Sequence, residues 1–342
     1  MAEKRSEYAK AAGLIAGAKR ILISGHLSPD GDALGSMLAL ARLLNAAGYQ
    51  AFATADLNAL GKLSFLEGVD ALIPVRKLKR QRFDLFIAVD CGSFERMPPE
   101  VRPVAEKLLT ICIDHHVTNT DFGDVSIVDP KASSTGELIW RFAKWNEWKL
   151  DRASAEALWV AMITDSGRFA YDSTSPGTLR AAGDLLKYHV RTAYINDIIY
   201  CEFSRKAIEL KRIAWRSLHV WKNRKVAEVT LTRDDFRSVR GTKADVEDVI
   251  EIPRSVAKNE IALFFYQIPD RTKETRCSIR TRGAWDATVL AAKFGGGGHI
   301  KAAGCTIKSP LAAAKRKMRS AVKEMIRSRN GKTGRTAEAK LS

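Results

Sequence analysis

Residues 21–36 read ILISGHLSPDGDALGS, and this stretch predicts how the first half of the chain folds. The apolar run at its start is typical of a strand buried in a parallel sheet. Over residues 33–47, Leu and Ala recur at helical spacing, and Gly48 suits the left-handed position that ends a helix. The stretch therefore predicts a strand and a helix joined by a tight turn over residues 28–32.

Three residues of this stretch have the conformational preferences that a tight turn needs. Pro29, Gly31 and Gly35 favour a sharp change of direction after the strand. We expect the turn to let Asp30 and Asp32 point into one crevice instead of alternating along a strand.

Further apolar runs extend the pattern along the first half of the chain. Residues 85–89 and 108–113 also read as buried parallel strands, with helical patterns between the runs. A helix is predicted to begin at Ser134, whose spacing from Glu137 matches a capping box, and another over residues 152–164. These features predict an α/β domain with a mainly parallel sheet flanked by helices.

The length of the chain predicts more than one domain. Its 342 residues exceed what one hydrophobic core usually serves, and 46% hydrophobic with 28% charged residues is typical of a folded protein. The pattern predicts a first α/β domain at residues 1–195, a linker helix at 196–222 and a smaller α/β domain at 223–328. Residues 329–342 are basic and lack apolar periodicity, which predicts a mobile tail.

Charge and cysteine content limit the classes of partner. A net charge of +17 favours phosphate-rich partners through long-range attraction. Five cysteines without paired spacing argue against a disulfide framework and against a thiolate zinc site. Because no apolar run could span a bilayer and the first residues lack a secretory signal, we expect a cytoplasmic location and no membrane partner.

Acidic and imidazole groups follow three of the predicted strands. They are His26, Asp30 and Asp32, then Asp90, then Asp114, His115 and His116. Ligands of open parallel sheets bind beyond the carboxyl ends of the strands, so these groups can converge. Because several carboxylates in one pocket repel one another, divalent cations are the natural counter-charge, and oxygen with imidazole nitrogen favours manganese-like or magnesium-like ions. A pair of such ions suits phosphoryl displacement.

Each of these elements has an ordinary structural interpretation when taken alone. Pro-Asp-Gly-Asp is a common turn composition, a strand-end Asp often caps a helix, and Asp-His-His occurs in solvated loops. Their joint occurrence at successive strand ends favours the functional interpretation.

The same residues carry a resemblance to a known family. The matching segments are His26–Ser36, Val89–Gly92, Asp114–His116, Thr164–Gly167 and, in the second half, Gly295–Gly304. They resemble the motifs of the DHH family of phosphoesterases and of its DHHA1 substrate-binding domain. The fourth segment reads Thr-Asp-Ser-Gly where many relatives have Thr-Asp-Thr-Gly. The two-domain length resembles the bifunctional oligoribonuclease and 3′-phosphoadenosine 5′-phosphate (pAp) phosphatase group.

The resemblance implies a set of metal ligands and catalytic residues. One manganese ion would be held by His26, Asp30 and Asp90, and the other by Asp32, Asp90, His115 and Asp165. Asp90 would bridge the two ions. His116 would face the scissile phosphate as an acid or hydrogen-bond donor, and Asp114 would orient the histidine pair.

The resemblance also implies substrate-binding residues. They are Arg280, Gly296, Gly297, Gly298 and His299 of the second domain, with Arg168 of the first. The glycine amides would cradle a phosphate. Arg168 and the neighbouring Phe169 have two open interpretations. Both could contact a nucleotide, or Arg168 could be solvated while Phe169 packs in the core.

Together these features predict a manganese-dependent phosphoesterase. The substrates that the resemblance implies are short oligoribonucleotides (nanoRNA) and pAp, hydrolysed by a hydroxide that two metal ions activate. The alternatives are a cyclic-dinucleotide or linear-dinucleotide phosphodiesterase, a pyrophosphatase, and a non-catalytic nucleic-acid-binding protein. Short RNA or nucleotides are the expected partners, and a homodimer is one of the oligomeric states left open.

Overall fold

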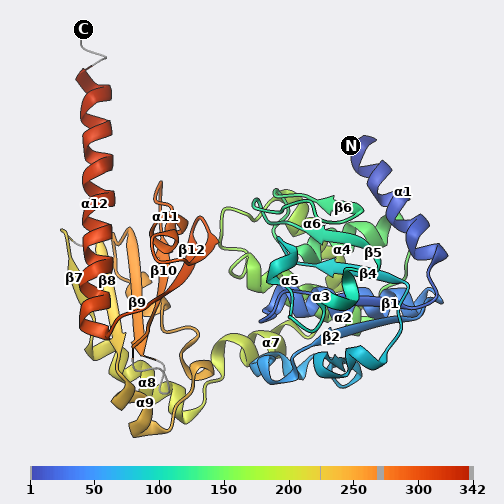
Figure 1. The fold of residues 1–342 in the computed structure, drawn as a ribbon, viewed down its shortest axis with the longest axis horizontal. Coiled ribbons are helices and arrows are strands. Elements are labelled where there is room, and N and C mark those ends of the chain that lie inside the picture. The colour runs from blue at the N-terminus through green and yellow to red at the C-terminus, as the bar shows by residue number, and fades with distance from the viewer. Residues whose placement is uncertain (1, 224, 268–272, 339–342) are drawn as a thin grey trace. The chain divides into compact units, whose positions relative to one another are not determined.

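This computed structural model describes the backbone of residues 2–223, 225–267 and 273–338. Side chains are described over 6–223, 225–267, 273–298 and 300–328. The chain divides into two compact units, Met1–Glu202 and Phe203–Ser342 (Figure 1). Among the described residues, no helix combines the length and the apolar character that crossing a bilayer requires.

The first unit is built on a six-stranded parallel sheet with strand order β3-β2-β1-β4-β5-β6. Its strands are β1 (Ile21–Ser24), β2 (Ala51–Ala55), β3 (Ile73–Pro74), β4 (Leu85–Val89), β5 (Leu109–Asp114) and β6 (Val125–Val128). The three predicted strands are confirmed as β1, β4 and β5. Strands β2, β3 and β6, of five, two and four residues, were not predicted from the sequence, because none of them stands out as a long apolar run.

Helices cover both faces of this sheet, because its central strands are buried on both sides. The helices are α1 (Ala2–Gly17), α2 (Gly31–Ala46), α3 (Arg102–Ala105), α4 (Thr135–Trp145), α5 (Arg152–Asp165), α6 (Pro176–Leu185) and α7 (Thr192–Asn196), which continues as a π-helix over Asp197–Cys201. Ile21 and Ile23 pack into the core with α2, α4 and α5, while Leu22 packs with α3 on the other face. The predicted α/β fold class is confirmed.

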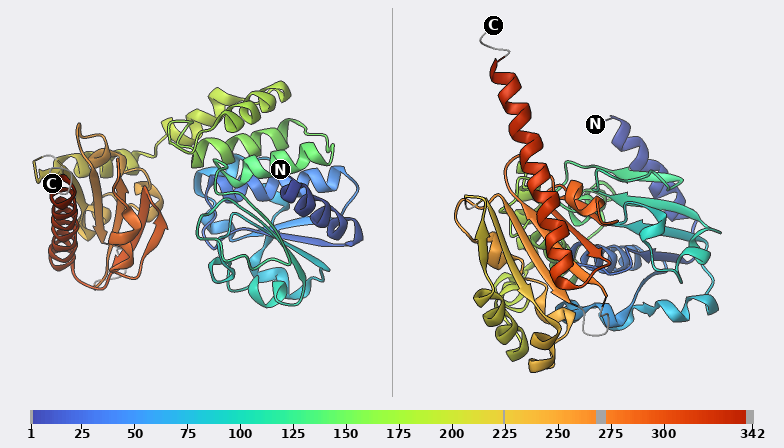
Figure 2. Two further views of the ribbon diagram at one scale, coloured as in Figure 1. Left: turned by 90° about the horizontal axis from the view of Figure 1, so that it is seen from above. Right: turned by 60° about the vertical axis from the view of Figure 1, so that its left-hand side comes forward.

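The second unit is a smaller α/β fold. Its sheet has the order β11-β12-β10-β9-β8-β7, in which β8 and β9 are parallel and the other pairs are antiparallel. The strands are β7 (His219–Trp221), β8 (Val226–Leu231), β9 (Ile261–Gln267), β10 (Thr275–Thr281), β11 (Gly297–His299) and β12 (Ala302–Ile307). The helices are α8 (Arg205–Arg216), α9 (Arg233–Val239), α10 (Glu251–Arg254), α11 (Ala287–Ala292) and α12 (Leu311–Glu338). Helices α11 and α12 pack on one face, and α8 to α10 pack on the other (Figure 2).

The segment for which the sequence predicts a linker helix, 196–222, has a different structure. Its central part is α8, which belongs to the second unit, and its last residues form the edge strand β7. Leu210 and Ala214 of α8 are fully buried against Val229 and Leu231 of β8. An apolar stripe at helical spacing needs such a surface to cover it, so the helix packs on the sheet instead of bridging two domains.

The mobility predicted for the tail at 329–342 stays a prediction, and part of this segment has a described backbone. The backbone of α12 stays helical as far as Glu338. The side chains of 329–338, and residues 339–342 entirely, lie outside the described part of the chain.

Candidate metal centre

The acidic and imidazole residues that follow β1, β4 and β5 lie together at the carboxyl edge of the first sheet. These strands are neighbours and parallel, so their ends meet. Asp165, the last residue of α5, joins the cluster from a helix. Within the described residues, three groups have ligand atoms within 4.8 Å of one another: His26 with Asp30 and Asp90; Asp32 with His115 and Asp165; and Asp90 with His115 and His116.

The turn after β1 places Asp30 and Asp32 at the start of α2. Asp30 is the N-cap residue, and its Oδ1 accepts hydrogen bonds from the amides of Asp32 at 3.0 Å and Ala33 at 3.1 Å. A capping side chain satisfies amides that have no partner within the helix. The carboxylate of Asp32, the second residue of the helix, is thereby directed toward the sheet edge.

Two glycines that the sequence assigns to this turn serve helix packing instead. A Cβ atom on Gly31 would lie 2.4 Å from Oγ1 of Thr164, and one on Gly35 would lie 2.3 Å from the carbonyl oxygen of Ala157. Both contacts are with α5, the helix that ends at Asp165. The glycines therefore let α2 and α5 approach closely enough for Asp32 and Asp165 to share one site.

Asp90 holds the centre of the cluster. Its backbone adopts a φ of 52°, in the left-handed region that non-glycine residues rarely occupy. Its Oδ2 lies 3.6 Å from His26 Nε2, and its Oδ1 lies 3.6 Å from His115 Nε2. Thr135 Oγ1 donates to Oδ1 at 3.2 Å. One carboxylate thus reaches both histidines.

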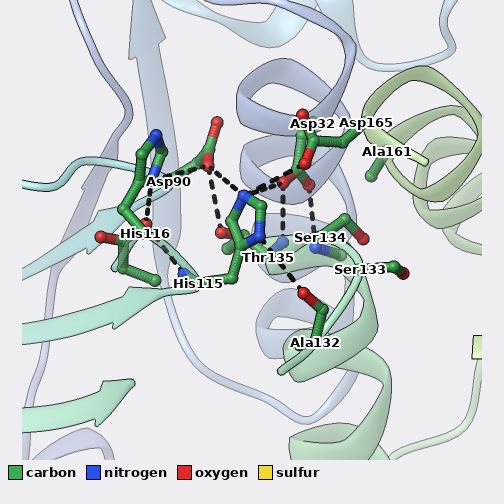
Figure 3. A network of polar contacts seen from close by, with 12 residues as sticks. Asp32, Asp90, His115, His116, Ala132, Ser133, Ser134, Thr135, Ala161 and Asp165 are labelled. Carbon is green, nitrogen blue, oxygen red and sulfur yellow. Dashed lines mark hydrogen bonds and ion pairs between the residues drawn. The ribbon is translucent and has the colours of Figure 1, made fainter. Parts of the chain in front are cut away.

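His115 lies between Asp90 on one side and Asp32 and Asp165 on the other (Figure 3). Its Nε2 is 3.3 Å from Asp165 Oδ2 and 3.6 Å from Asp32 Oδ2. Its Nδ1 lies 3.4 Å from the carbonyl oxygen of Ala132. Because a carbonyl only accepts, this contact places the ring proton on Nδ1 and leaves the lone pair of Nε2 for a metal ion.

The amino end of α4 fixes the carboxylate of Asp32. The amides of Thr135 and Gly136 donate to its two oxygens at 2.7 and 2.9 Å, and Ser36 Oγ donates at 3.1 Å (Figure 3). These donors were not predicted from the sequence. The sequence pattern predicted that a helix begins at Ser134. It did not show that the first amides of this helix donate to Asp32, about a hundred residues earlier in the chain.

His116 is held by a separate carboxylate. Its Nδ1 is 2.6 Å from Asp114 Oδ1, and Asn119 Nδ2 donates to Asp114 Oδ2 at 2.6 Å. Burial favours the neutral imidazole, but the hydrogen bond with Asp114 and the charge of Asp90 raise the pKa of His116 above its usual value. Asn119, which fixes Asp114 in this way, was also missed from the sequence.

The carboxylates of the cluster repel one another. Burial, together with the charges of Asp90 and Asp165, raises the pKa of Asp32 well above its usual range. Burial and neighbouring carboxylates also raise the pKa of Asp90, and that of Asp165 to about 7. The ion-pair partners of these carboxylates in the described part of the chain are histidines. Buried carboxylates and imidazoles without a neutralising lysine or arginine suit divalent cations that prefer oxygen and nitrogen ligands.

The raised pKa of Asp165 predicts that the free energy of unfolding of metal-free protein depends on pH. The folded state binds this proton more tightly than the unfolded state, so stability is complete at low pH and falls as pH rises toward about 7. Replacing Asp165 by Asn should therefore raise the melting temperature of chelator-treated protein more at pH 8 than at pH 5. Thermal melts of both proteins at both pH values measure this, and an equal shift at the two values would contradict it.

The residues after Asp165 divide between surface and core. Arg168 is exposed, and its guanidinium carbon lies 4.8 Å from the ring centre of Tyr200. Phe169 packs edge-on against Trp159 with ring centres 5.6 Å apart. Of the two interpretations of Phe169, the structure therefore supports core packing.

The glycine run of the second unit is a hairpin instead of an open loop. The amides of Gly295 and Gly296 donate to the carbonyls of Ala292 and Ala291 at the end of α11. Residues 297–299 form the edge strand β11, which pairs with β12. A Cβ atom on Gly296 would lie 2.2 Å from the carbonyl oxygen of Gly304, so close strand approach explains the glycine.

Arg280 lies on β10, on the same face of the strand as Arg276 and Ser278. This face is half-buried, and the alternate residues Cys277 and Ile279 face the core with α12. Arg276, which donates to Thr306 Oγ1 at 2.9 Å, was not found from the sequence. The side chain of His299 lies outside the described residues.

Comparisons with known proteins agree with these features. The chain is 31% identical over 316 residues to a bifunctional oligoribonuclease and PAP phosphatase of Thermus thermophilus, with 90% of each chain covered. It is 27% identical over 298 residues to the Bacillus subtilis protein of that name, covering 84% of this chain and 90% of that protein. An exopolyphosphatase-related protein from Bacteroides fragilis has the same fold, with a TM-score of 0.86 over 94% of this chain and 96% of that chain at 24% identity.

Two family models match the two units. One, described as the N-terminal domain of the DHH family, matches residues 20–162, and the other, described as the DHHA1 domain, matches residues 236–328. The resemblance predicted from the motifs is thereby confirmed: the chain belongs to the DHH family and carries a DHH N-terminal domain followed by a DHHA1 domain.

Proposed function

We propose that this chain is a manganese-dependent phosphoesterase that hydrolyses short oligoribonucleotides and pAp. The observation that carries the proposal is the convergence of His26, Asp30, Asp32, His115 and Asp165 around Asp90. The names of the two relatives, oligoribonuclease and PAP phosphatase, support the choice of substrates.

Two divalent ions fit the donor groups of the cluster. His26, Asp30 and Asp90 would hold one ion, and Asp32, His115 and Asp165, with Asp90 as a shared ligand, the other. When bound, such ions lower the pKa of coordinated water and neutralise charge on a phosphoryl group. The mixture of carboxylate oxygen and imidazole nitrogen, without thiolate, favours manganese over structural zinc.

His116 is the proposed proton donor. Its Nδ1 is engaged with Asp114, so the proposed contact with a phosphate oxygen would be made by Nε2. The raised pKa keeps more of the imidazole protonated near neutral pH, which suits donation of a proton or a hydrogen bond to the departing oxygen. Asp114 and Asn119 hold the ring in this orientation.

In the second unit, Arg280 is the proposed ligand of a substrate phosphate. Its guanidinium can form two parallel hydrogen bonds with phosphate oxygens. Gly297 and Gly298, in the edge strand β11, are the proposed further backbone contacts, because the amides of Gly295 and Gly296 are occupied by α11. Since alternate residues of β11 pair with β12, one of these two glycines would donate its amide to the phosphate. His299 and Arg168 remain in the proposed substrate set.

A substrate panel tests this function. Purified protein is assayed with pAp, a dinucleotide, longer RNA, single-stranded DNA, a cyclic dinucleotide and pyrophosphate, each with manganese and with chelator. We expect hydrolysis of pAp and the dinucleotide only with metal present. Faster turnover of the cyclic dinucleotide would favour that alternative, and bound nucleic acid without turnover or bound metal would favour a non-catalytic protein.

A further inference from the structure

Helix α12 is unusually basic. Its 28 residues contain nine Lys or Arg and two Glu. No part of the proposed chemistry uses this helix, since Arg280 and the glycine hairpin lie on other elements.

The described part of α12 has two distinct faces. Ala314, Met318 and Val322 are fully buried against the sheet. Arg316, Lys323 and Arg327 are exposed and lie at spacings of seven and four residues, which places them on one side of an α-helix. We call these three residues the basic face. Figures 1 and 2 show that α12 follows the second sheet and continues beyond its strands.

The other cations on the part of α12 whose side chains are described have partners within the second unit. Lys315 and Arg319 pair with the buried Glu228, at 3.1 and 2.6 Å, and Lys317 donates to Ser309 Oγ at 2.7 Å. The one acidic side chain described on the helix, Glu324, pairs with Lys293 at 2.6 Å.

The basic face lacks this kind of compensation. Among the described residues, Arg316, Lys323 and Arg327 form no ion pair. Lys323 and Arg327 are four positions apart, where like charges destabilise a helix by a few tenths of a kcal/mol, roughly. The arrangement therefore does not serve the stability of the helix, and it suits an external polyanion.

We propose that the basic face of α12 binds the phosphate backbone of single-stranded RNA. This inference rests on the proposed function and adds a binding surface for longer substrates. Charge complementarity supports it: phosphates attract a row of cations through counterion release, independently of sequence. A membrane surface fits less well, because the exposed positions beside these cations include Ala312, Ser320 and Glu324, which offer no large apolar group for insertion.

The test replaces the basic face with neutral helix-forming residues. The triple variant Arg316→Gln, Lys323→Gln, Arg327→Gln is compared with the unchanged chain by fluorescence anisotropy, using an oligoribonucleotide of about 20 nucleotides. An Asp90→Asn background in both proteins keeps the RNA intact. We expect affinity at about 50 mM salt to fall roughly tenfold, and the slope of log K against log salt to fall by about 2, since each phosphate contact contributes about 0.7.

A matched triple variant controls for net charge. Lys77→Gln, Lys79→Gln, Arg80→Gln removes the same charge from exposed positions of the first unit and should leave RNA affinity within about twofold of the unchanged chain. Hydrolysis of pAp and a dinucleotide, measured with Asp90 intact, should be unaffected by the α12 triple.

The inference would be overturned if the α12 triple variant bound RNA as tightly as the unchanged chain, or if both triple variants lost the same RNA affinity. Binding to phosphatidylserine vesicles is measured as well. The inference would also be overturned if the α12 triple variant lost vesicle binding but kept RNA binding. Absence of hydrolysis in the unchanged chain would instead contradict the proposed function, so the two failures are distinguishable.

Discussion

Asp90→Asn is expected to lower kcat/KM for pAp and for a dinucleotide by at least about a thousandfold, which is the scale of losing metal-assisted stabilisation of a transition state. The two carboxylate oxygens of Asp90 face different histidines, His26 and His115, that belong to separate groups of ligands. An amide cannot supply the negative charge that both ions would share. Steady-state kinetics and measurement of bound metal should show a joint loss of activity and metal.

Asp121→Asn is a matched control for this substitution. Asp121 has a φ of 53°, nearly that of Asp90, but its side chain is exposed. The control should keep full activity. Because Asp90 adds to the repulsion that raises the pKa of Asp32, metal-free Asp90→Asn should melt no lower than the unchanged protein. Full activity of Asp90→Asn would contradict the shared-ligand assignment, whereas a lower melting temperature would point to misfolding.

Gly35→Ala is expected to reduce the free energy of unfolding by about 2–3 kcal/mol, a typical cost of overpacking a well-packed contact. The added Cβ would lie 2.3 Å from the carbonyl oxygen of Ala157, a backbone atom that can move only with its helix. Since α2 carries Asp32 and α5 carries Asp165, separating the helices should also weaken metal binding. Chemical denaturation and metal titration measure the two effects.

Gly183→Ala provides the opposite case. Gly183 lies within α6, and a Cβ atom there would have no neighbour within 4 Å. Alanine at an open helical position should stabilise the protein by up to about 1 kcal/mol. If Gly35→Ala were as stable as Gly183→Ala, the close approach of α2 and α5 would not be what requires glycine at position 35.

Local sequence patterns were enough to predict the parallel core and the identity of the clustered residues. Buried parallel strands are continuous apolar runs, so β1, β4 and β5 could be predicted from the sequence. The carboxyl ends of neighbouring parallel strands lie at one edge of the sheet. His26, Asp90 and His115 follow those strands directly. Their convergence could therefore be predicted from local pattern and a general rule of topology, and the family motifs identified the fold.

The contacts that hold the cluster in place could not be predicted in this way, because they join segments that are far apart in the chain. The amides that fix Asp32 come from Thr135 and Gly136, and the approach of α5 depends on the missing side chain of Gly35. Likewise, α8 packs on the second sheet because its apolar stripe needs cover. All three features depend on which distant segments meet: the helix amides that bind Asp32, the close contact of two helices, and the sheet that covers an apolar helix face. A local sequence pattern carries no information about which distant segment a given segment will contact.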